Sequence, residues 1–344
     1  MPRGLGFVLL GACASAAPDH PPRSNAPNAR TASSVSSAAS ILSSVPWVAA
    51  APVTASVSIE PAPQPEAVVP CPPEMEYVDT LHCPQAQQTC LDSSLNGSNH
   101  LVICHKFAQA RRCKMPERRQ RFCIDRYEYP GVAGAHPPVM VSAYDAAGLC
   151  AERGKRLCWE SEWTAACEGP QKYPFPYGYT RDATRCNIDN RFVHPDLDKV
   201  HAAEDEVRGP ELLRLDQSVP SGAQSGCESG FGVRDMTGNF DEWVRTETVR
   251  GEGQWAGLKG GAWGFVRNAC RPITTKHVPH WSYYFISFRC CSDPPALSLD
   301  EPSAGVPLWS PPLIPLPRHP AGKPLLRGWT PPPGSVRPNA PSLR

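Results

Sequence analysis

Two stretches in the middle of the chain repeat apolar positions with a helical period and carry start and stop signals. In the first, Ser142 is followed three residues later by Asp145, a near capping box, and the run 146–153 ends at Gly154. The second, 160–168, opens with acidic residues, which the positive end of a helix favours, and a Gly-Pro pair follows it. The pattern predicts two short helices.

Outside these stretches the pattern is short and irregular. The best strand candidates, 75–78 and 101–104, lie in a polar, loop-like N-terminal segment, 71–123, that contains six cysteines. Beyond residue 170 the chain is rich in glycine, proline and aromatic residues, with short apolar runs and no further long helical period. Two short helices among short strands predict an α+β fold with low secondary-structure content, in which disulfides compensate for a modest core.

Proline divides the chain into three parts. Residues 14–70 are mainly alanine, proline and serine, and such a segment cannot bury enough apolar surface to offset its ordering entropy, so we expect a disordered tether. Residues 293–344 are equally proline-rich and are predicted to be a disordered tail, with a ligand for a proline-reading domain as the alternative. Residues 71–292 form the predicted domain, long enough to bury about 70% of its unfolded surface.

Fifteen cysteines is a large number for a chain of 344 residues. A reducing compartment would leave so many thiols open to oxidation, whereas an oxidising one converts them to cross-links. Zinc ribbons need two close cysteine pairs, and no C-x-x-C occurs in the sequence. The cysteines therefore predict disulfides in an exported protein.

The first thirteen residues agree with export. Arg3 supplies a positive charge, 5–10 form a short apolar stretch, and 10–13 (LGAC) resemble the signal box of a bacterial lipoprotein, in which Cys13 would carry the lipid. Cleaved secretion and a chance match are the alternatives, and the shortness of the stretch leaves open a start upstream of Met1. Removing Cys13 leaves fourteen cysteines, an even number, as full pairing requires. No later stretch is long and apolar enough to span a bilayer.

Charge gives no sign of a nucleic-acid partner. The chain has 34 basic and 33 acidic residues, for a formal net charge of +1, and none of the usual nucleic-acid motifs. Two short basic runs, 111–114 and 118–121, lie beside cysteines, and a solvated surface is favoured there over a site for a polyanion.

Three groups of motifs in the predicted domain occur in a characteristic order and spacing. They are 139–146 (VMVSAYDA) with 154–163 (GKRLCWESEW), then 231–243 (FGVRDMTGNFDEW), then 259–263 (KGGAW), 270–271 (CR) and 288–290 (FRC). They resemble V-x-V-S-W-x-D-A with G-K-R-L-P-T-E-A-E-W, F-G-L-Y-D-M-x-G-N-V-x-E-W, and R-G-G-S-W, C-R and G-F-R-C of the formylglycine-generating-enzyme (sulfatase-modifying-factor) family. The resemblance implies that family's fold, an elaborated C-type-lectin-like α+β domain.

The resemblance also implies a structural calcium site in the second motif group. In the family this loop binds calcium through two carboxylates and two backbone carbonyls, which are donors that a hard cation favours. The matching donors here are the Asp235 side chain, the Gly238 and Phe240 carbonyls, and the Glu242 side chain. A second family site begins at the position of Asn187. The alternative is that these carboxylates only hydrogen-bond the loop.

The third motif group bears on catalysis. Active family members bind Cu(I) with two cysteines spaced C-x₄-C just after G-G-S-[WYF], because paired thiolates suit this soft ion. The corresponding stretch, 260–271, contains one cysteine, Cys270, and Ala262 stands in place of the serine. Cys270 is the one catalytic candidate. A lone thiol cannot supply the two sulfur ligands that Cu(I) needs here, so the sequence does not favour copper oxidase chemistry.

The resemblance further implies cross-links between distant segments. The implied pairs are Cys150–Cys290 and Cys167–Cys270. Cys291 directly follows one of these cysteines, and neighbouring cysteines rarely bridge each other because their side chains diverge. Cys158 and Cys123 are its candidate partners.

Two functions of different classes remain. The first, favoured by the missing copper pair, is a non-catalytic module that binds a peptide, a glycan or an envelope protein on its lectin-like surface. The second is a formylglycine-generating-type oxidoreductase that oxidises a protein cysteine or another substrate with O₂ and a metal. The predicted binding groove is lined by Trp263, Arg267, Arg271, His277 and Trp281. His277 and His280 are also spaced to share a metal ion, although two histidines without a third ligand are more typical of a surface.

Overall fold

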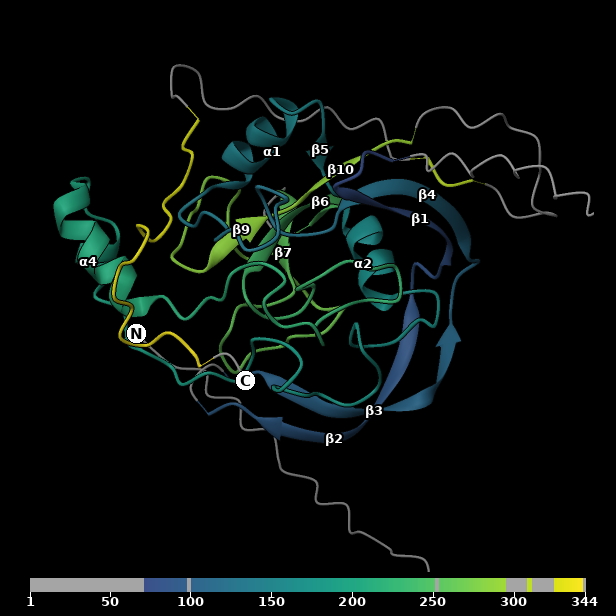
Figure 1. Ribbon diagram of the computed structural model, residues 1–344. Helices are drawn as coiled ribbons and strands as arrows, with labels where there is room; N and C mark the ends of the chain where they lie inside the picture. Colours follow the sequence, from purple (N-terminus) through teal and green to yellow (C-terminus); the bar gives the residue numbers. More distant parts are fainter. Residues whose placement is uncertain (1–70, 98–99, 251–253, 295–307, 311–324, 343–344) are drawn as a thin grey trace, which may run out of the picture. The chain divides into compact units, whose positions relative to one another are not determined.

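The computed structural model of the chain describes residues 71–97, 100–250, 254–294, 308–310 and 325–342. Within them, the strands form two four-stranded sheets and one hairpin (Figure 1). The first sheet contains, in spatial order, β1 (Met75–His82), β4 (Arg118–Asp125), β10 (Cys290–Ser292) and β5 (Arg156–Leu157). The second contains β8 (Ile273–Thr274), β7 (Gln254–Lys259), β6 (Asp241–Arg250) and β9 (Ile286–Phe288). The hairpin consists of β2 (Ala86–Leu95) and β3 (Val102–Cys113).

The first sheet joins the two ends of the domain. β1 and β4 pair antiparallel over their full length, from Met75 opposite Asp125 to His82 opposite Arg118. The short β10 pairs with β4 on one side and β5 on the other, so a strand from near residue 290 closes the sheet. The predicted strand 75–78 thus lies within β1, and 102–104 of the other predicted strand segment lie within β3 of the hairpin.

Both predicted helices are present. α1 spans Ala143–Ala151 and α2 spans Glu160–Glu168. At the start of α1 the capping box is complete: Ser142 Oγ accepts from the Asp145 N–H at 3.2 Å, and the Asp145 carboxylate accepts from the Ser142 N–H at 3.0 Å. α2 buries Trp163 completely in the core beside the first sheet.

Two further helices are present, and the longer of them contradicts the expectation that no further long helical period follows residue 170. They are α3 (Leu197–Val200) and α4 (Asp205–Leu215). Pro210 lies inside α4, and a proline lacks the N–H that a helix interior uses, so the sequence carries a helix-breaking signal at a position where the helix continues. The buried face of α4 is also narrow, because only its C-terminal part, around Leu212, packs in the core.

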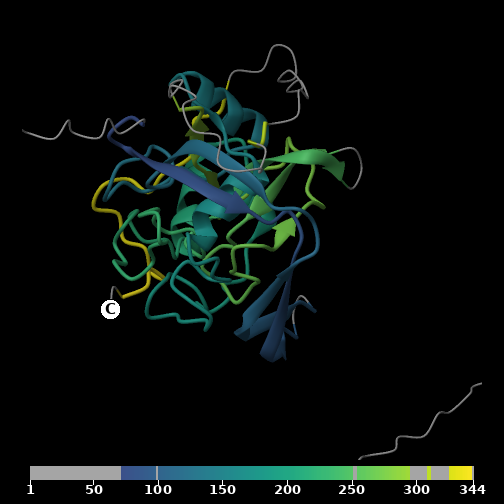
Figure 2. The same ribbon diagram turned by 90° about the vertical axis from the view of Figure 1, so that its right-hand side faces the viewer.

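The N-terminal segment 71–123 consists largely of strands, whereas its polar sequence suggested loops. The β2–β3 hairpin extends away from the two larger sheets (Figure 2). Leu91, Leu95 and Val102 on this hairpin are each more than 60% exposed. Most of β2 is exposed on both faces, so its sequence has no reason to alternate between apolar and polar residues, and it resembles a loop.

All fourteen cysteines of the described residues form disulfides. The pairs are Cys71–Cys123, Cys83–Cys113, Cys90–Cys104, Cys150–Cys290, Cys158–Cys291, Cys167–Cys270 and Cys186–Cys227. They include both pairs implied by the family resemblance. Cys291 bridges Cys158, one of its two candidate partners. The neighbouring Cys290 and Cys291 thus tie β10 to α1 and to the segment that precedes α2.

Part of the C-terminal segment is ordered against the domain, which corrects the expectation of a disordered tail. Trp329 and Val139 exchange both backbone hydrogen bonds, at 2.8 and 2.9 Å. The Leu326 N–H donates to the capping carboxylate of α1 at 2.8 Å, and Arg337 pairs with Asp216 at 2.8 Å. Such docking relies on backbone groups and single side chains, so it produces no apolar period that sequence patterns reveal.

Residues 1–70, with Cys13 and the predicted tether, lie outside the described residues. In the part of the chain that the structure describes, every helix is too short or too polar to cross a bilayer.

Candidate functional site

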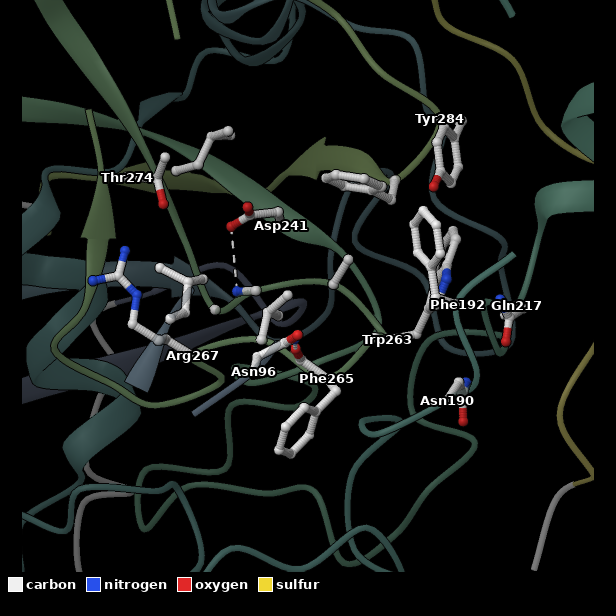
Figure 3. A pocket seen from close by; sticks show the side chains of 18 of the residues that line it. Asn96, Asn190, Phe192, Gln217, Asp241, Trp263, Phe265, Arg267, Thr274 and Tyr284 are labelled. Atoms are coloured by element: carbon white, nitrogen blue, oxygen red, sulfur yellow. Dashed lines mark hydrogen bonds between the residues drawn. The ribbon is translucent and has the colours of Figure 1, made fainter. Parts of the chain in front are cut away.

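A cavity of about 720 Å³ lies beside the second sheet, where β6 begins and β7 ends (Figure 3). The loop 260–267 after β7 forms its floor, and the segment 190–194 forms one side. The residues around the turn of the β2–β3 hairpin, Asn96 and Leu101, close another side. Segments that are far apart in sequence therefore build one pocket.

The floor of the cavity depends on two glycines and one buried asparagine. Gly260 and Gly261 have φ values of +89° and +69°, a region that side chains rarely adopt. The Asn268 amide donates to the carbonyls of Gly260 and Ala262 at 3.3 and 2.7 Å. A Cβ at Gly261 would lie 2.8 Å from the Asn268 amide nitrogen, so this close turn needs glycine.

Aromatic side chains form much of the cavity wall. Trp263 is 4% exposed, and its ring packs edge-on against Phe240 and, at 6.2 Å, beside Tyr284. Phe192 stands at the opening and is 66% exposed. Phe265 stacks on His105 of β3, which fixes the floor loop against the hairpin. The wall is thus buried and packed on the sheet side and exposed at the opening.

One carboxylate, Asp241, lines the cavity. It is the first residue of β6, and its Oδ1 accepts from the Gly261 N–H at 3.2 Å, the contact drawn in Figure 3. Burial raises the pKa of Asp241 to about 7, although the Gly261 hydrogen bond favours the ionised form. Within the described residues it forms no ion pair, so its charge is not balanced by a neighbouring cation at contact distance.

The basic residues of the cavity are arranged differently. Burial lowers the pKa of Lys259 to about 8, and its Nζ donates to the carbonyls of Arg271 and Pro272 at 3.2 and 3.4 Å. Its ammonium group also lies 5.2 Å from the centre of the Trp163 ring. Arg267 is exposed at the edge of the cavity. The interior of the cavity therefore presents the Asp241 carboxylate as a hydrogen-bond acceptor, and exposed basic residues such as Arg267 lie at its edge.

Comparison with known proteins identifies the family of the domain. Residues 96–294, more than half of the chain, match the sulfatase-modifying factor enzyme 1-like domain. The chain belongs to this family. The structure accordingly has the α+β formylglycine-generating-enzyme fold, with low helical content and seven disulfides.

Curated members of the family match at modest identity. The chain is 30% identical over 165 residues to the inactive C-alpha-formylglycine-generating enzyme 2 of Bos taurus, covering 45% of this chain and 50% of that protein. The Mus musculus protein of the same name is 32% identical over 166 residues, covering 45% and 49%. The formylglycine-generating enzyme of Bos taurus is 27% identical over 176 residues, covering 46% and 44%. The chain thus spans about half the length of the curated relatives it matches.

Solved structures also align with the chain. The crystal structure of CarF aligns at a TM-score of 0.38 and 13% identity, covering 64% of this chain and 98% of that one. PvdO from Pseudomonas aeruginosa aligns at a TM-score of 0.36 and 18% identity, covering 65% and 95%.

Of the five predicted groove residues, Trp263 and Arg267 line the cavity of this family member and the other three do not. Arg271 turns away and pairs with the fully buried Glu168 at the end of α2, and it donates to the Cys83 carbonyl at 3.1 Å. The Cys167–Cys270 bridge holds the preceding residue to α2, which directs the arginine to the same helix.

The remaining predicted groove residues form a separate aromatic stack. The rings of His277 and Trp281 are 3.8 Å apart, and Trp281 stacks in turn on Tyr283 at 5.0 Å. His277 therefore contacts an aromatic ring. In the described residues, no group of three histidine, cysteine, aspartate or glutamate side chains is placed to hold a metal ion, so His277 and His280 lack a third ligand of that kind.

The thiol that a copper site of this family would need is in a disulfide. Cys270 is fully buried and bonded to Cys167. Every other cysteine of the described residues is bridged as well. These residues therefore do not fit a two-thiolate copper site, and we derive no step through copper.

The loop of the implied calcium site is held by protein donors. Both oxygens of Glu242 are engaged: the Arg289 guanidinium donates to them at 2.6 and 2.8 Å, and the Trp163 indole donates at 2.8 Å. The Asp235 carboxylate accepts from the Gly222 N–H at 2.7 Å. A calcium ion at this loop would therefore compete with Arg289 and Trp163 for the Glu242 oxygens.

The backbone around the two carboxylates is equally constrained. Gly238 has a φ of +83°, and a Cβ there would lie 2.3 Å from the Asn187 carbonyl. The Asn187 amide donates to the Gln217 carbonyl at 2.9 Å and to Asn239 at 3.1 Å. Phe240 is buried and packs against Trp263. The loop thus positions the start of β6, and calcium binding there stays a prediction.

Sequence reasoning missed Asp241, the most distinctive polar residue of the cavity. It occupies the variable position of the N-x-x-E-W motif, so the family pattern gives it no role. Its position was nevertheless informative, because an acidic residue between the buried Phe240 and Glu242 must point to the opposite side of the strand. Phe192 carried no comparable signal, since the segment around it has no motif.

Proposed function

We propose that this chain is an exported member of the sulfatase-modifying-factor family that binds a ligand in the cavity beside its second sheet, without copper-dependent oxidation. The observation that supports it is the Cys167–Cys270 disulfide, which occupies the one cysteine of the loop that holds copper in active members. Without paired thiolates, a soft cuprous ion lacks its preferred ligands. The cavity remains as the functional feature of this face.

The cavity has the properties of a ligand site. Pockets for small ligands and side chains usually measure about 300–1,000 Å³ and combine apolar walls with a few polar groups. Here Trp263, Tyr284 and Phe285 supply apolar wall, and Asp241 supplies an acceptor. Relatives named inactive enzymes also occur in Bos taurus and Mus musculus, in line with a family member that does not catalyse oxidation.

Copper binding is the measurement that separates binding from oxidation. We expect Cu(I), supplied anaerobically as its acetonitrile complex so that no reductant touches the disulfides, to show no stoichiometric binding to the purified full chain. We also expect no uptake of O₂ above background with a cysteine-containing sulfatase peptide. Protein whose disulfides have first been reduced should bind copper and serves as the positive control. One equivalent of tightly bound Cu(I) with peptide-dependent turnover would establish the oxidoreductase instead.

The cysteines support a proposed cellular location. Seven disulfides favour an oxidising compartment, and the box that ends at Cys13 favours a lipid anchor in the cell envelope. In this proposal the chain is a bacterial-type lipoprotein, with secretion after cleavage as the alternative. The ligand then comes from a peptide, a glycan or a protein of the envelope.

Lipid attachment is expected to be visible by labelling. When the full-length gene is expressed with labelled palmitate, label should appear in the protein and disappear in Cys13→Ser. Cys90→Ser, which opens the Cys90–Cys104 disulfide of the exposed hairpin, is the matched control and should stay labelled. A wild-type protein without label would remove the anchor from the proposal and leave secretion.

A further inference from the structure

Asp241 is the one acidic residue among those that line the cavity. Its Oδ1 accepts from the Gly261 N–H, whereas Oδ2 receives no hydrogen bond from any described residue. No lysine or arginine of the described residues lies within ion-pair distance of it. The carboxylate thus has unused acceptor capacity on the side of the cavity.

The cations near Asp241 are already committed or solvated. Lys259 directs its Nζ to two backbone carbonyls, so two of its three donors are in use. Arg191, His194 and Arg267 are exposed residues, where water and salt screen their charge. The acceptor that a ligand meets inside the cavity is therefore the carboxylate, while the exposed cations stand at the opening.

Physical chemistry defines what such a carboxylate binds best. A charge shielded from water is costly unless a donor or an opposite charge satisfies it. A charge-assisted hydrogen bond from an ammonium group is stronger than one from a neutral donor. Aromatic faces attract the same ammonium group, and Trp263 and Phe285 stand in the same cavity wall.

We propose that Asp241 anchors the ligand through a primary ammonium group carried on an aromatic or apolar body. The body packs against Trp263, Tyr284 and Phe192, and the ammonium group donates to the free Oδ2 of Asp241. The inference rests on the proposed binding function and names the ligand class of the same cavity. A free amine and the lysine side chain of a peptide share this chemistry.

Three probes of matched size test the charge preference: phenethylamine, phenethyl alcohol and phenylacetate. Titration calorimetry with the full chain is expected to show phenethylamine binding about tenfold tighter than the alcohol, with phenylacetate weakest. Asp241→Asn should bring the amine to the affinity of the alcohol and leave the alcohol unchanged, because the amide oxygen still accepts from Gly261. Asp198→Asn, on the exposed side of α3, is the matched control and should keep the preference.

A second variant locates the binding in this cavity. Phe192 is 66% exposed, so Phe192→Ala should leave the melting temperature nearly unchanged. It should weaken all three probes by a similar factor of about three to ten, because it removes aromatic contact and no charge. Two peptides with blocked termini, one with phenylalanine beside lysine and one with phenylalanine beside norleucine, then identify the source of the ammonium group. Tighter binding of the lysine peptide indicates a peptide side chain, and equal affinities indicate a free amine.

The outcomes separate the two proposals. If the alcohol or phenylacetate binds as tightly as the amine, or if Asp241→Asn keeps the preference, the ammonium inference is wrong and cavity binding stands. If none of the probes or peptides binds the wild-type chain, the proposed binding function fails, and the inference fails with it.

Discussion

Replacing Glu242 with alanine is expected to lower the free energy of unfolding by about 3–5 kcal/mol, because it leaves a buried guanidinium without its counter-charge. Arg289 and Glu242 are 0% and 1% exposed and form a two-point ion pair at 2.6 and 2.8 Å. The remaining Arg289 donors reach backbone carbonyls, among them that of Arg234 at 2.9 Å, so the side chain cannot swing out to water. Urea unfolding at equilibrium measures the loss.

An exposed ion pair provides the matched control. Arg327 and Glu152 pair at 3.0 Å with 70% and 42% exposure, so Glu152→Ala should cost less than about 1 kcal/mol. Adding Arg289→Met to Glu242→Ala should recover part of the stability, since the unpaired charge disappears together with its partner. A loss below about 1 kcal/mol for Glu242→Ala would contradict the buried-pair account.

The same variant decides the role of calcium. If Glu242 stabilises the loop through Arg289 and Trp163, the loss of stability is the same in EGTA and in millimolar calcium. If calcium raises the melting temperature of the wild type and Glu242→Ala abolishes that rise, Glu242 is a calcium ligand, as the family resemblance implies.

Local signals in the sequence predicted the parts of the fold that local interactions determine. The Ser142 and Asp145 capping box predicted α1, and the acidic first turn predicted α2. α4 was missed because its Pro210 is a helix-breaking signal that tertiary contacts override. The β2–β3 hairpin was missed because a ribbon exposed on both faces needs no alternating pattern.

The site was harder to predict because its residues come from segments that are distant in the sequence and meet only in the folded structure. The resemblance pointed to the loop after β7, whose Trp263 and Arg267 line the cavity. It could not show that the Cys167–Cys270 bridge turns Arg271 towards Glu168. Nor could it show that residues near 96 and 192 complete the cavity, since neither segment belongs to a motif. Disulfides, in contrast, were predictable where the family pattern fixed their partners.

Removing both bridges of β10 is expected to destabilise the domain by about 7 kcal/mol, more than the sum of the two single losses. Cys150–Cys290 and Cys158–Cys291 close nearly the same loop, with sequence separations of 140 and 133. While one remains, the other closes only a small ring of about ten residues, so its removal alone should cost about 3 kcal/mol. Chain entropy thus makes each bridge a partial substitute for the other.

The second loss is larger because a longer ring opens. Once both bridges are gone, the nearest remaining disulfide is Cys167–Cys270. Restoring one β10 bridge would then close a ring of about forty residues, and closing a ring of that size stabilises the fold by about 4 kcal/mol. We therefore expect an excess of about 1 kcal/mol over additivity when Cys150→Ala/Cys290→Ala is combined with Cys158→Ala/Cys291→Ala. Urea unfolding of the three variants measures the excess.

The exposed hairpin supplies the control for this cycle. Cys90–Cys104 has a separation of 14 and shares no loop with β10, so Cys90→Ala/Cys104→Ala should combine additively with Cys150→Ala/Cys290→Ala, within about 0.5 kcal/mol. Additive losses for the two β10 bridges, equal to those of the hairpin control, would show that each bridge acts through local contacts and not by restricting the unfolded chain.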